Sequence, residues 1–373
     1  METRRLIFTV ILAMIAFFLW QAWIAEHPSA PQNQTNQQSV TSDSPQSTFP
    51  ALAQQSFPTQ QQMTQYPTEV APGNAIHVKT DVLDITIDAQ GGNLIHSALL
   101  QYPVAVNKPD TPVILFNNVP ATRYVAESGL LSDVTPDGKE IPVTFNSERL
   151  QYELGVDANE LRVPLTWTSP QGIQFTKEYV FKRGQYVIDL AYKVTNHSGK
   201  SWKGQLANQL SRTDFKPAKK GFVRTFLGAS YSSSGTPYEK LTYKKMAKQN
   251  LSENISGGWI AMQQHYFLSA WVPNQQAENH FYSNVSPAGM YTIGSLSPGM
   301  VVAPGQSATL SSQLYVGPEL PGVLKNIAPH LELTVDYGWL WFISIILLWL
   351  LQHIYQVIGN WGWSIVAVTV LIK

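Results

Sequence analysis

Apolar and polar side chains alternate in short runs throughout residues 75 to 330, and this period-two pattern is the strongest constraint on the fold. One run extends from Leu83 to Ile87, and others extend from Leu161 to Trp167 and from Tyr186 to Val194. Successive side chains of a β-strand point to opposite faces, so a strand with one buried face has this period. No long helical pattern separates the runs. The sequence therefore predicts a large antiparallel β-sandwich.

Turn residues separate these runs. The tetrapeptide SPQG at residues 169–172 has Pro at its second position and Gly at its fourth, which indicates a type I turn, and a second turn is expected at 182–185. The glycine pairs at 91–92 and 257–258 are expected at turns or bulges, because glycine accepts positive φ. Pro318 to Ala328 is the best short helix in the region.

Four aromatic residues near the end of this region allow two interpretations. They could line a sugar-binding cleft, but in a sandwich such residues more often fill the core. These residues are Trp259, Tyr266, Phe267 and Trp271.

Composition excludes several classes of function. The 25 Lys and Arg residues balance 25 Asp and Glu residues, so the chain lacks the basic field of a nucleic-acid-binding protein. No cysteine is present, which excludes disulfides, thiolate zinc sites and a cysteine nucleophile. No P-loop, dinucleotide-binding or zinc-protease motif occurs, and the histidines of 75–330 are widely separated. We therefore expect no cofactor and no metal site.

An uncharged stretch of 19 residues from Leu6 to Ile24 is long enough for a transmembrane helix. Arg4 and Arg5 precede it and Glu26 follows it, so the positive-inside rule places the N-terminus in the cytoplasm and the rest outside. A cleaved signal peptide is the alternative, but its apolar region would be shorter and would end in small residues. Residues 27–74, rich in Gln, Pro, Ser and Thr, have the composition of a disordered linker.

The C-terminal residues are strongly apolar. Gly338 to Val357 contains several tryptophans, and its few polar side chains lie close together, with Gln352 and Gln356 one helical turn apart. This pattern favours a helix in the outer membrane interface, although a true span is the alternative. The run that begins at Trp361 is then the crossing segment, and the sequence stops before it is long enough to span.

Basic residues gather between 212 and 248, where nine basic side chains face two acidic ones. Outside the cytoplasm this segment could bind anionic lipid or an acidic partner, and the alternative is a solvated surface. The residues proposed for this patch are Lys216, Lys219, Lys220, Arg224, Lys240, Lys244, Lys245 and Lys248.

Several strings resemble the YidC membrane-protein insertases of Gram-negative bacteria. The two most specific are TVDYGWLWFIS (334–344) and GNWGWSI (359–365). The others are VKTDVLDITI (78–87), RTFLGASY (224–231), GGWIAMQQHYFLSAW (257–271) and LYVGPE (314–319). The resemblance covers the anchor, the linker, the region 75–330 and the start of the family's membrane core.

The resemblance implies a mainly β fold. Its central domain would be a large antiparallel β-supersandwich in the periplasm, like that of galactose mutarotases. An N-terminal transmembrane helix would precede the domain, and an interface helix at 331–358 and the start of a transmembrane helix at 359–373 would follow it. The interface helix would include Tyr337, Gly338, Trp339, Trp341 and Phe342.

The resemblance also implies an insertase and chaperone of the bacterial inner membrane, without enzymatic activity or a cofactor. Its partners would be nascent inner-membrane proteins, the lipid bilayer, and the Sec translocon with SecD and SecF. Lys373 occupies the position of the positively charged residue in the family's hydrophilic groove, which is usually Arg. A lysine that extends toward the cytoplasmic interface is the alternative interpretation.

Two other functions fit parts of the sequence. One is a periplasmic sugar-binding or epimerase-like domain, which would need a histidine and a carboxylate that face each other in one cleft. The other is a membrane-anchored scaffold whose basic patch recruits a partner. In that scaffold the C-terminal helix would be a simple anchor without a buried charge.

Overall fold

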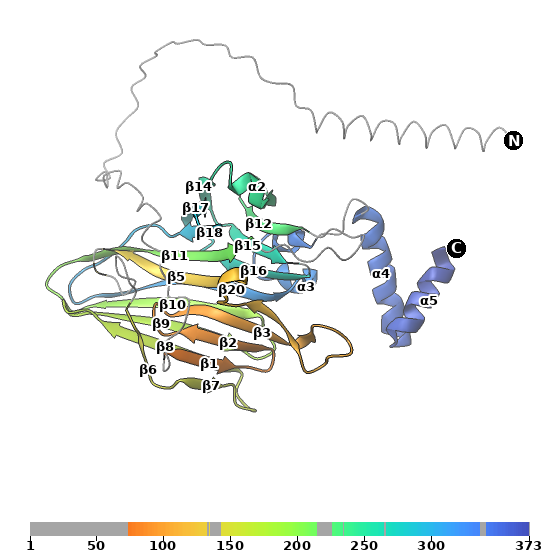
Figure 1. The fold of residues 1–373 in the computed structure, drawn as a ribbon, viewed down its shortest axis with the longest axis horizontal. Coiled ribbons are helices and arrows are strands. Elements are labelled where there is room, and N and C mark those ends of the chain that lie inside the picture. Colours follow the sequence, from red (N-terminus) through yellow and green to blue (C-terminus); the bar gives the residue numbers. More distant parts are fainter. Residues whose placement is uncertain are drawn as a thin grey trace, which may run out of the picture. The chain divides into compact units, whose positions relative to one another are not determined.

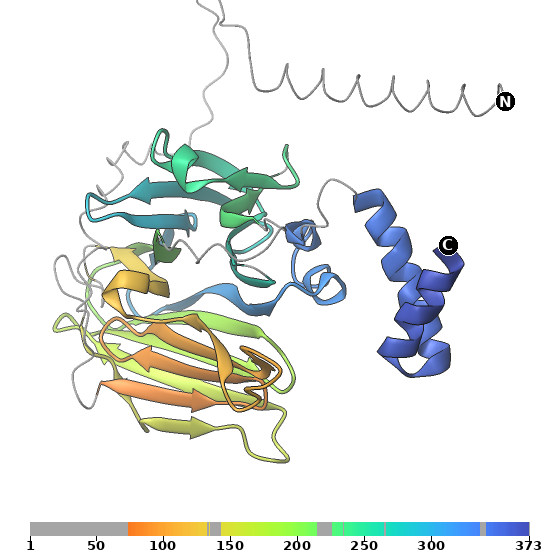
Figure 2. The ribbon, with the colours of Figure 1, turned by 45° about the vertical axis from the view of Figure 1, so that its right-hand side comes forward.

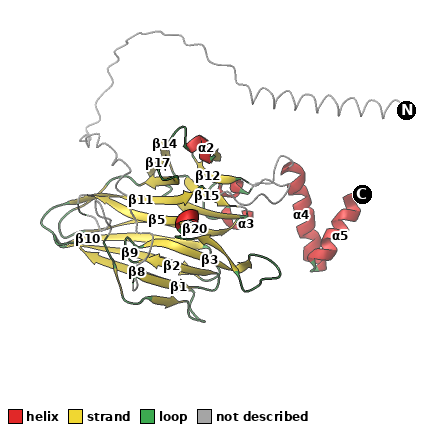
Figure 3. Ribbon diagram, viewed as in Figure 1, coloured by secondary structure: helices red, strands yellow, loops and turns green. Residues whose placement is uncertain are grey.

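The computed structural model describes residues 74–132, 134, 143–214, 226–233, 235–264, 266–335 and 341–372. The predicted N-terminal anchor and nearly all of the predicted linker lie outside these residues. Figure 1 shows that strands form one body from residue 74 onward, and Figure 3 shows the two longest helices of the described residues after it.

Two large sheets make up this body. The first has the order β14-β17-β18-β11-β5-β3-β2-β1-β7, with β19 beside β11 and β4 beside β3. All its described pairs are antiparallel except β1 with β7. Its strands are β1 (Ala75–Lys79), β2 (Leu83–Asp88), β3 (Asn93–Pro103), β4 (Pro112–Phe116), β5 (Tyr124–Ser132), β7 (Gln151–Glu153), β11 (Trp202–Thr213), β14 (Ser252–Ser256), β17 (Glu278–Val285), β18 (Met290–Leu296) and β19 (Met300–Val302).

The second sheet has the order β13-β12-β15-β16-β20-β10-β9-β8-β6 and is antiparallel between its described strands. Its strands are β6 (Asn146–Ser147), β8 (Glu160–Thr168), β9 (Ile173–Lys182), β10 (Val187–Asn196), β12 (Leu227–Ser232), β13 (Glu239–Leu241), β15 (Trp259–Gln264), β16 (Phe267–Val272) and β20 (Ser307–Pro318). The predicted fold class, a mainly β antiparallel sandwich, is confirmed.

The alternating runs lie where their pattern predicts. The apolar residues between Leu83 and Ile87 are fully buried in β2, and those between Tyr186 and Val194 are buried in and beside β10. The predicted turn at 169–172 joins β8 to β9, with Gly172 N donating to Ser169 O at 3.0 Å. All four glycines of the two predicted pairs have positive φ.

The core lies between the two sheets and contains polar groups that link them. The Tyr124 hydroxyl of β5 contacts Ser269 of β16, and the indole N–H of Trp271 donates to the Gln209 carbonyl at 3.0 Å. Lys177 of β9 is completely buried, and its ammonium group donates to the carbonyls of Gly91 at 3.0 Å and Ser128 at 2.8 Å. These bonds satisfy groups that burial would otherwise penalise.

Short helical turns follow the last strand. The helix expected from Pro318 to Ala328 is only one turn, α3 (Pro321–Leu324), followed by irregular turns and the 3-10 turn η3 (Leu331–Thr334). The extent of that prediction is therefore wrong. Pro321 suits a first helical turn, but the chain then bends so that the side chain of Leu324 is fully buried in the core.

Two longer helices come last, α4 (Trp341–Ile358) and α5 (Trp361–Ile372). Together they cover most of the two C-terminal segments for which the sequence predicts helices. Within the described part of the chain, no helix meets the combined length and apolarity expected of a membrane span. The short helix α2 (Tyr243–Met246) lies between β13 and β14.

Candidate functional site

The connection between α4 and α5 is a tight turn with satisfied backbone groups. Gly359 has a φ of +69° and donates its N–H to the Tyr355 carbonyl at 2.7 Å, which ends α4. The side-chain oxygen of Asn360 accepts from the backbone N–H groups of Gly362 at 2.9 Å and Trp363 at 3.3 Å, which caps α5. The two residues between the helices therefore provide one cap each.

The α4–α5 hairpin exposes apolar side chains and buries a polar one. Ser364 is fully buried and Val368 nearly so, whereas Val370, Leu371 and Ile372 are exposed. The Ser364 hydroxyl donates to the Asn360 carbonyl at 2.8 Å. The two helices border a cleft of about 420 Å³, which is lined by Ser344, Leu347, Leu348, Leu351, Ile365, Val368 and Thr369.

Most of the predicted membrane residues cannot be placed by the structure. Tyr337, Gly338, Trp339 and Lys373 lie outside the described residues. Trp341 and Phe342 form the first turn of α4, although their side chains are not among those described. The roles assigned to these six residues stay predictions.

The basic segment is described in part. Lys240 lies on β13, Lys244 and Lys245 on α2, and Lys248 follows, and all four are exposed. Their other predicted companions, Lys216, Lys219, Lys220 and Arg224, lie outside the described residues.

Two of these exposed lysines contact neighbouring side chains. Lys245 forms an ion pair with Glu239, and the Lys240 ammonium lies 5.1 Å from the ring centre of Phe226. Arg212, counted among the nine basic residues, is buried and stacks on the Tyr124 ring at 4.8 Å. It therefore adds no exposed charge.

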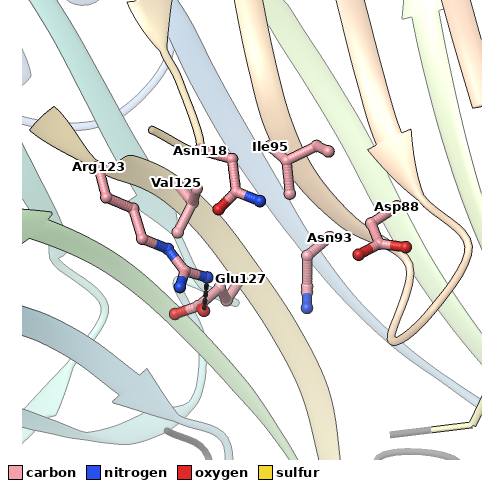
Figure 4. A pocket seen from close by; sticks show the side chains of 7 residues that line it. All are labelled: Asp88, Asn93, Ile95, Asn118, Arg123, Val125 and Glu127. Carbon is pink, nitrogen blue, oxygen red and sulfur yellow. Dashed lines mark ion pairs between the residues drawn. The ribbon is translucent and has the colours of Figure 1, made fainter. Parts of the chain in front are cut away.

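A buried polar cluster, which sequence reasoning missed, lies on the outer face of the first sheet. The residues come from three neighbouring strands and the segment before one of them. They are Asp88 from β2, Asn93 from β3, Asn118 and Arg123 from the segment before β5, and Glu127 from β5 (Figure 4). Tyr124 faces the core, so by alternation its neighbours on β5 face outward. We call these five residues the outer-face cluster.

Glu127 is the centre of the hydrogen bonding in the outer-face cluster. Its carboxylate accepts from Gln209 Nε2 at 2.7 Å and Ser211 Oγ at 2.6 Å, and Arg123 lies 3.9 Å away. Gln209 in turn accepts from the Tyr282 hydroxyl at 2.9 Å. The network thus extends over β5, β11 and β17, which makes it a structural link across the sheet.

Burial shifts the pKa values of the two acids in this cluster in the same direction. It raises the pKa of Glu127, which the bonds from Ser211 and the charge of Arg123 only partly oppose. Burial also raises the pKa of Asp88, against a hydrogen bond from the Gln90 N–H and the charge of Arg123. The space between the side chains that line the cluster is too small to hold a water molecule. The cluster is therefore packed rather than open to a ligand.

The alternative epimerase-like function needs a histidine opposite a carboxylate in a cleft. No histidine is among the residues that line the outer-face cluster. His96 lies near enough to Asp84 and His77 for their charges to affect its pKa, which burial lowers, but none of the three lines that cluster. Among the described residues, no group of three or more His, Asp or Glu side chains could hold a metal ion.

Of the four aromatic residues, Trp259 and Trp271 are fully buried, as the core interpretation predicts. Phe267 is partly buried against the same core. Tyr266 is different, because its side chain is 62% exposed and its φ is +73°. The core interpretation is wrong for Tyr266, which lies in the turn between β15 and β16 rather than within a strand.

Comparison with known proteins supplies the identity of the chain. A family model described as the YidC periplasmic domain matches residues 75–350. Membrane protein insertase YidC of Coxiella burnetii (strain RSA 331 / Henzerling II) is 42% identical over 387 residues, which cover 100% of this chain and 67% of the relative. The chain belongs to the YidC family. Its function is membrane-protein insertion.

Other matches agree with this YidC assignment. The insertase of Legionella pneumophila (strain Corby) is 43% identical over 383 residues, covering 100% of this chain and 67% of the relative. That of Pseudomonas fluorescens (strain SBW25) is 39% identical over 386 residues, covering 100% and 68%. The resemblance stated from the sequence strings is confirmed.

The matches among solved structures are more distant. A galactose mutarotase-like protein from Lactobacillus casei ATCC 334 has a TM-score of 0.44 and 10% identity, over 65% of this YidC family member and 99% of that chain. A galactose mutarotase related enzyme from Lactobacillus acidophilus has a TM-score of 0.43 and 9% identity, over 65% and 97%.

Proposed function

We propose that the α4–α5 hairpin is the part of this chain that acts in the membrane, and that insertion proceeds without covalent chemistry or a cofactor. The observation that supports the proposal is the inverted pattern of the hairpin, with apolar side chains outside and Ser364 inside. Exposed apolar surface on this scale is unfavourable in water and favourable in lipid. The two hydroxyl groups of α5, on Ser364 and Thr369, both donate to backbone carbonyls four residues earlier.

The topology follows from the charges at the N-terminus. Arg4 and Arg5 would remain in the bacterial cytoplasm, and the sandwich would lie in the periplasm, with the chain anchored in the inner membrane. Reporter fusions at positions 60 and 300 test this arrangement. Periplasmic reporter activity is expected at both positions, and cytoplasmic activity at either one would contradict it.

Lys373 would supply positive charge to the path of the inserted protein. The twelve residues of α5 rise about 18 Å at 1.5 Å each, so a helix that enters from the outer face would place Lys373 beyond the middle of the bilayer. An ionisable group at that depth costs roughly 2.5 to 3.5 kcal/mol on insertion scales, so it is kept there for a function. Its charge would attract acidic or polar segments of the nascent protein, without the bidentate pairing that arginine allows.

Substitution of Lys373 in the complete protein tests this role. Lys373→Ala should slow the insertion of a substrate with an acidic periplasmic tail by roughly tenfold or more, because a shift of 1.4 kcal/mol is tenfold. Lys373→Arg should retain activity, since the charge remains. Val370→Ala, on α5 and three residues before Lys373 in the sequence, is the matched control. Equal insertion rates for Lys373→Ala and the unsubstituted protein on several substrates would remove Lys373 from the mechanism.

The basic segment is proposed to bind an acidic partner, such as SecD and SecF of the Sec translocon, or anionic lipid. Support comes from the exposure of Lys240, Lys244 and Lys248 on one short stretch of the sandwich. Reversal of Lys219, Lys220, Lys244 and Lys245 to Glu should reduce co-purification, and added salt should weaken the interaction because it screens exposed charges over about 8 to 10 Å.

Reversal of two exposed lysines elsewhere on the sandwich, Lys193→Glu and Lys203→Glu, is the control and should leave binding unchanged. If binding survives both the four charge-reversing substitutions and high salt, the segment is a solvated surface.

A further inference from the structure

Two turns at one end of the sandwich present valine at their tips. In the turn at 105–108, Lys108 N donates to Ala105 O at 2.9 Å, and Val106 at its second position is 99% exposed. In the turn at 155–158, Ala158 N donates to Gly155 O at 3.1 Å, and Val156, again at the second position, is 91% exposed. Gly, Pro, Asn, Asp and Ser dominate turns, so a fully exposed valine at both tips is unusual.

The two turns lie at the same end of the first sheet. The turn at 155–158 follows β7, whose last residue Glu153 pairs with Lys79 of β1. Lys79 pairs with Asp84 of β2, and the neighbouring Leu83 pairs with Leu99 of β3, which then runs on toward the turn at 105–108. Figures 1 and 2 both show the connection between β3 and β4 on the side of the sandwich where α3 lies.

The structure holds the turn at 155–158 firmly. The guanidinium group of Arg183 donates to the carbonyls of Gly155 at 2.5 Å, Val156 at 3.0 Å and Ala158 at 2.9 Å. Three carbonyls fixed by one side chain leave the turn little freedom. Val156 is therefore exposed in a defined position and not by chance motion of a loose loop.

Tyr266 and the segment that ends the sandwich extend the same surface. The ring of Tyr102, at the base of the β3–β4 connection, lies 5.8 Å from that of Phe267, the neighbour of Tyr266. The Tyr266 carbonyl accepts from Glu319 N at 2.8 Å, which joins this turn to the start of α3. Leu320 and Val323 of that region are also exposed.

The conformation of Tyr266 supports a role for its exposed ring. A non-glycine residue at a φ of +73° is strained, and tyrosine is not among the residues that tolerate this region well. Strain of this kind persists where a side chain is needed in one direction. An aromatic ring with a hydroxyl group is also typical of the boundary between membrane and water.

The chain leaves the sandwich at this end and continues into the hairpin. The described sandwich ends at Val335, and α4 begins at Trp341. Six residues can extend over at most about 20 Å, so the start of α4 is tethered within that distance of Val335. If the hairpin lies in the membrane, as proposed above, the lipid surface is within reach of this end of the sandwich.

We propose that this end of the sandwich docks on the lipid bilayer, with Val104, Val106, Val156, Tyr266, Leu320 and Val323 in contact with the membrane interface. The inference rests on the proposed membrane position of the hairpin. Lipid fits better than a protein partner because the apolar residues sit on separate turn tips. A protein interface would instead need one contiguous, closely packed core.

The absence of cysteine makes a direct test possible. Single cysteines at Val106, Val156 and Gln171 are labelled with an environment-sensitive fluorophore in the full-length protein, reconstituted in phosphatidylethanolamine and phosphatidylglycerol vesicles. Gln171 is the matched control. β8 begins near Val156, and the turn that contains Gln171 follows the other end of β8 and joins it to β9. The eight residue steps of β8 separate the two turns by roughly 27 Å.

Lipids that carry a nitroxide quencher should reduce emission at positions 106 and 156 at least about twofold more than at 171, because only the first two would reach the interface. Val106→Asp should lower the ratio of docked to undocked protein roughly tenfold, read from the label at 156, because burial of a valine side chain is lost. The matched substitution Gln171→Asp should leave that label unchanged.

Equal quenching at 106, 156 and 171 would overturn the inference. So would labels at 106 and 156 that are shielded from both lipid and aqueous quenchers, which would indicate a protein partner or a second copy. A further label at Ile365 on α5 separates this inference from the proposed function. If the Ile365 label is quenched by lipid while those at 106 and 156 are not, only the docking is wrong; if Ile365 is not quenched, the proposed membrane position of the hairpin fails.

Discussion

The sandwich and the α4–α5 hairpin place their large apolar side chains differently. In the sandwich, Trp259 and Trp271 are fully buried between the sheets, whereas the hairpin exposes Val370 and Leu371 and buries Ser364. A chain folded for water hides its apolar groups, so two regions with opposite patterns are adapted to different surroundings. The comparison teaches that one covalent chain carries two regions with different surfaces, which supports the proposal that the hairpin lies in lipid.

The largest expected effect comes from the core of the sandwich. Trp271→Ala should lower the free energy of unfolding of the sandwich by roughly 3 to 5 kcal/mol, because it leaves a cavity and the Gln209 carbonyl loses a donor. Urea denaturation followed by circular dichroism measures the change. Val370→Ala should leave that free energy unaltered. Similar losses for both variants would show that the hairpin also packs as a water-soluble core does.

A charged side chain on the exposed face of the hairpin tests whether that face contacts lipid or water. Val370→Asp should have no effect on the unfolding of the sandwich, but it should disfavour membrane integration of α5 by roughly 2.5 to 3.5 kcal/mol. Quenching of a label at Ile365 by lipids that carry a nitroxide measures the integration of α5, and Val370→Leu is the control. Unchanged integration of the Asp variant would mean that this face of α5 meets water or protein rather than lipid.

The outer-face cluster should make the stability of the sandwich depend on pH. Burial raises the pKa of Glu127 above its ordinary value of 4.5, so the folded state binds a proton more readily than the unfolded state. Stability from this group is therefore fully present below pH 4.5 and is lost as the pH rises through the higher folded pKa. Glu127→Gln should flatten this part of the profile.

Urea midpoints measured at several pH values with Glu127→Gln test that expectation. Glutamine keeps an acceptor for Gln209 and Ser211, so the variant should remain folded. Ser211→Ala is the comparison variant: it keeps the carboxyl group but removes a donor that lowers its pKa, so the pH dependence should persist and move to higher pH. An identical pH dependence for Glu127→Gln and the unsubstituted protein would assign it to another acid, with Asp88 the first to examine.

The smallest effect is expected at the basic surface. Lys245→Ala removes an ion pair with Glu239 between half-exposed side chains, and such pairs contribute about 0 to 1 kcal/mol. Urea denaturation should therefore barely change, as it should for Glu239→Gln. A loss well above 1 kcal/mol would mean that reversal of these lysines disturbs the fold as well as any partner binding.

Much of the sandwich follows from its sequence. The period-two runs and the turn at 169–172 predict β2, β8, β9 and β10, because a strand with one buried face has only one register that hides its apolar side. The pairing of strands distant in sequence, such as β11 with β5, does not follow. Local patterns specify the face of a strand but not its neighbour.

The outer-face cluster and Lys177 could not be predicted for a related reason. Glu127 and Asp88 occupy the polar positions of alternating runs, which normally face water, yet both are buried. Their burial depends on what covers the outer face of the sheet, and Lys177 is buried because backbone carbonyls of the first sheet meet its ammonium group. Both kinds of burial depend on tertiary structure. Tyr266 was mistaken for core because composition alone cannot show that it lies in a turn.

The position of β20 has a consequence for the order of synthesis. β20 lies between β16 and β10 and pairs with both, so these two strands, separated by a long stretch of sequence, are joined in the sheet only through β20. The second sheet therefore cannot close before residue 318 has been made and released, and the hairpin follows directly behind it. A growing chain thus presents an open, incomplete sheet for most of the time that the domain is being made. The strand edges that β20 will pair with stay unpaired, and able to bind other chains, until shortly before α4 is made.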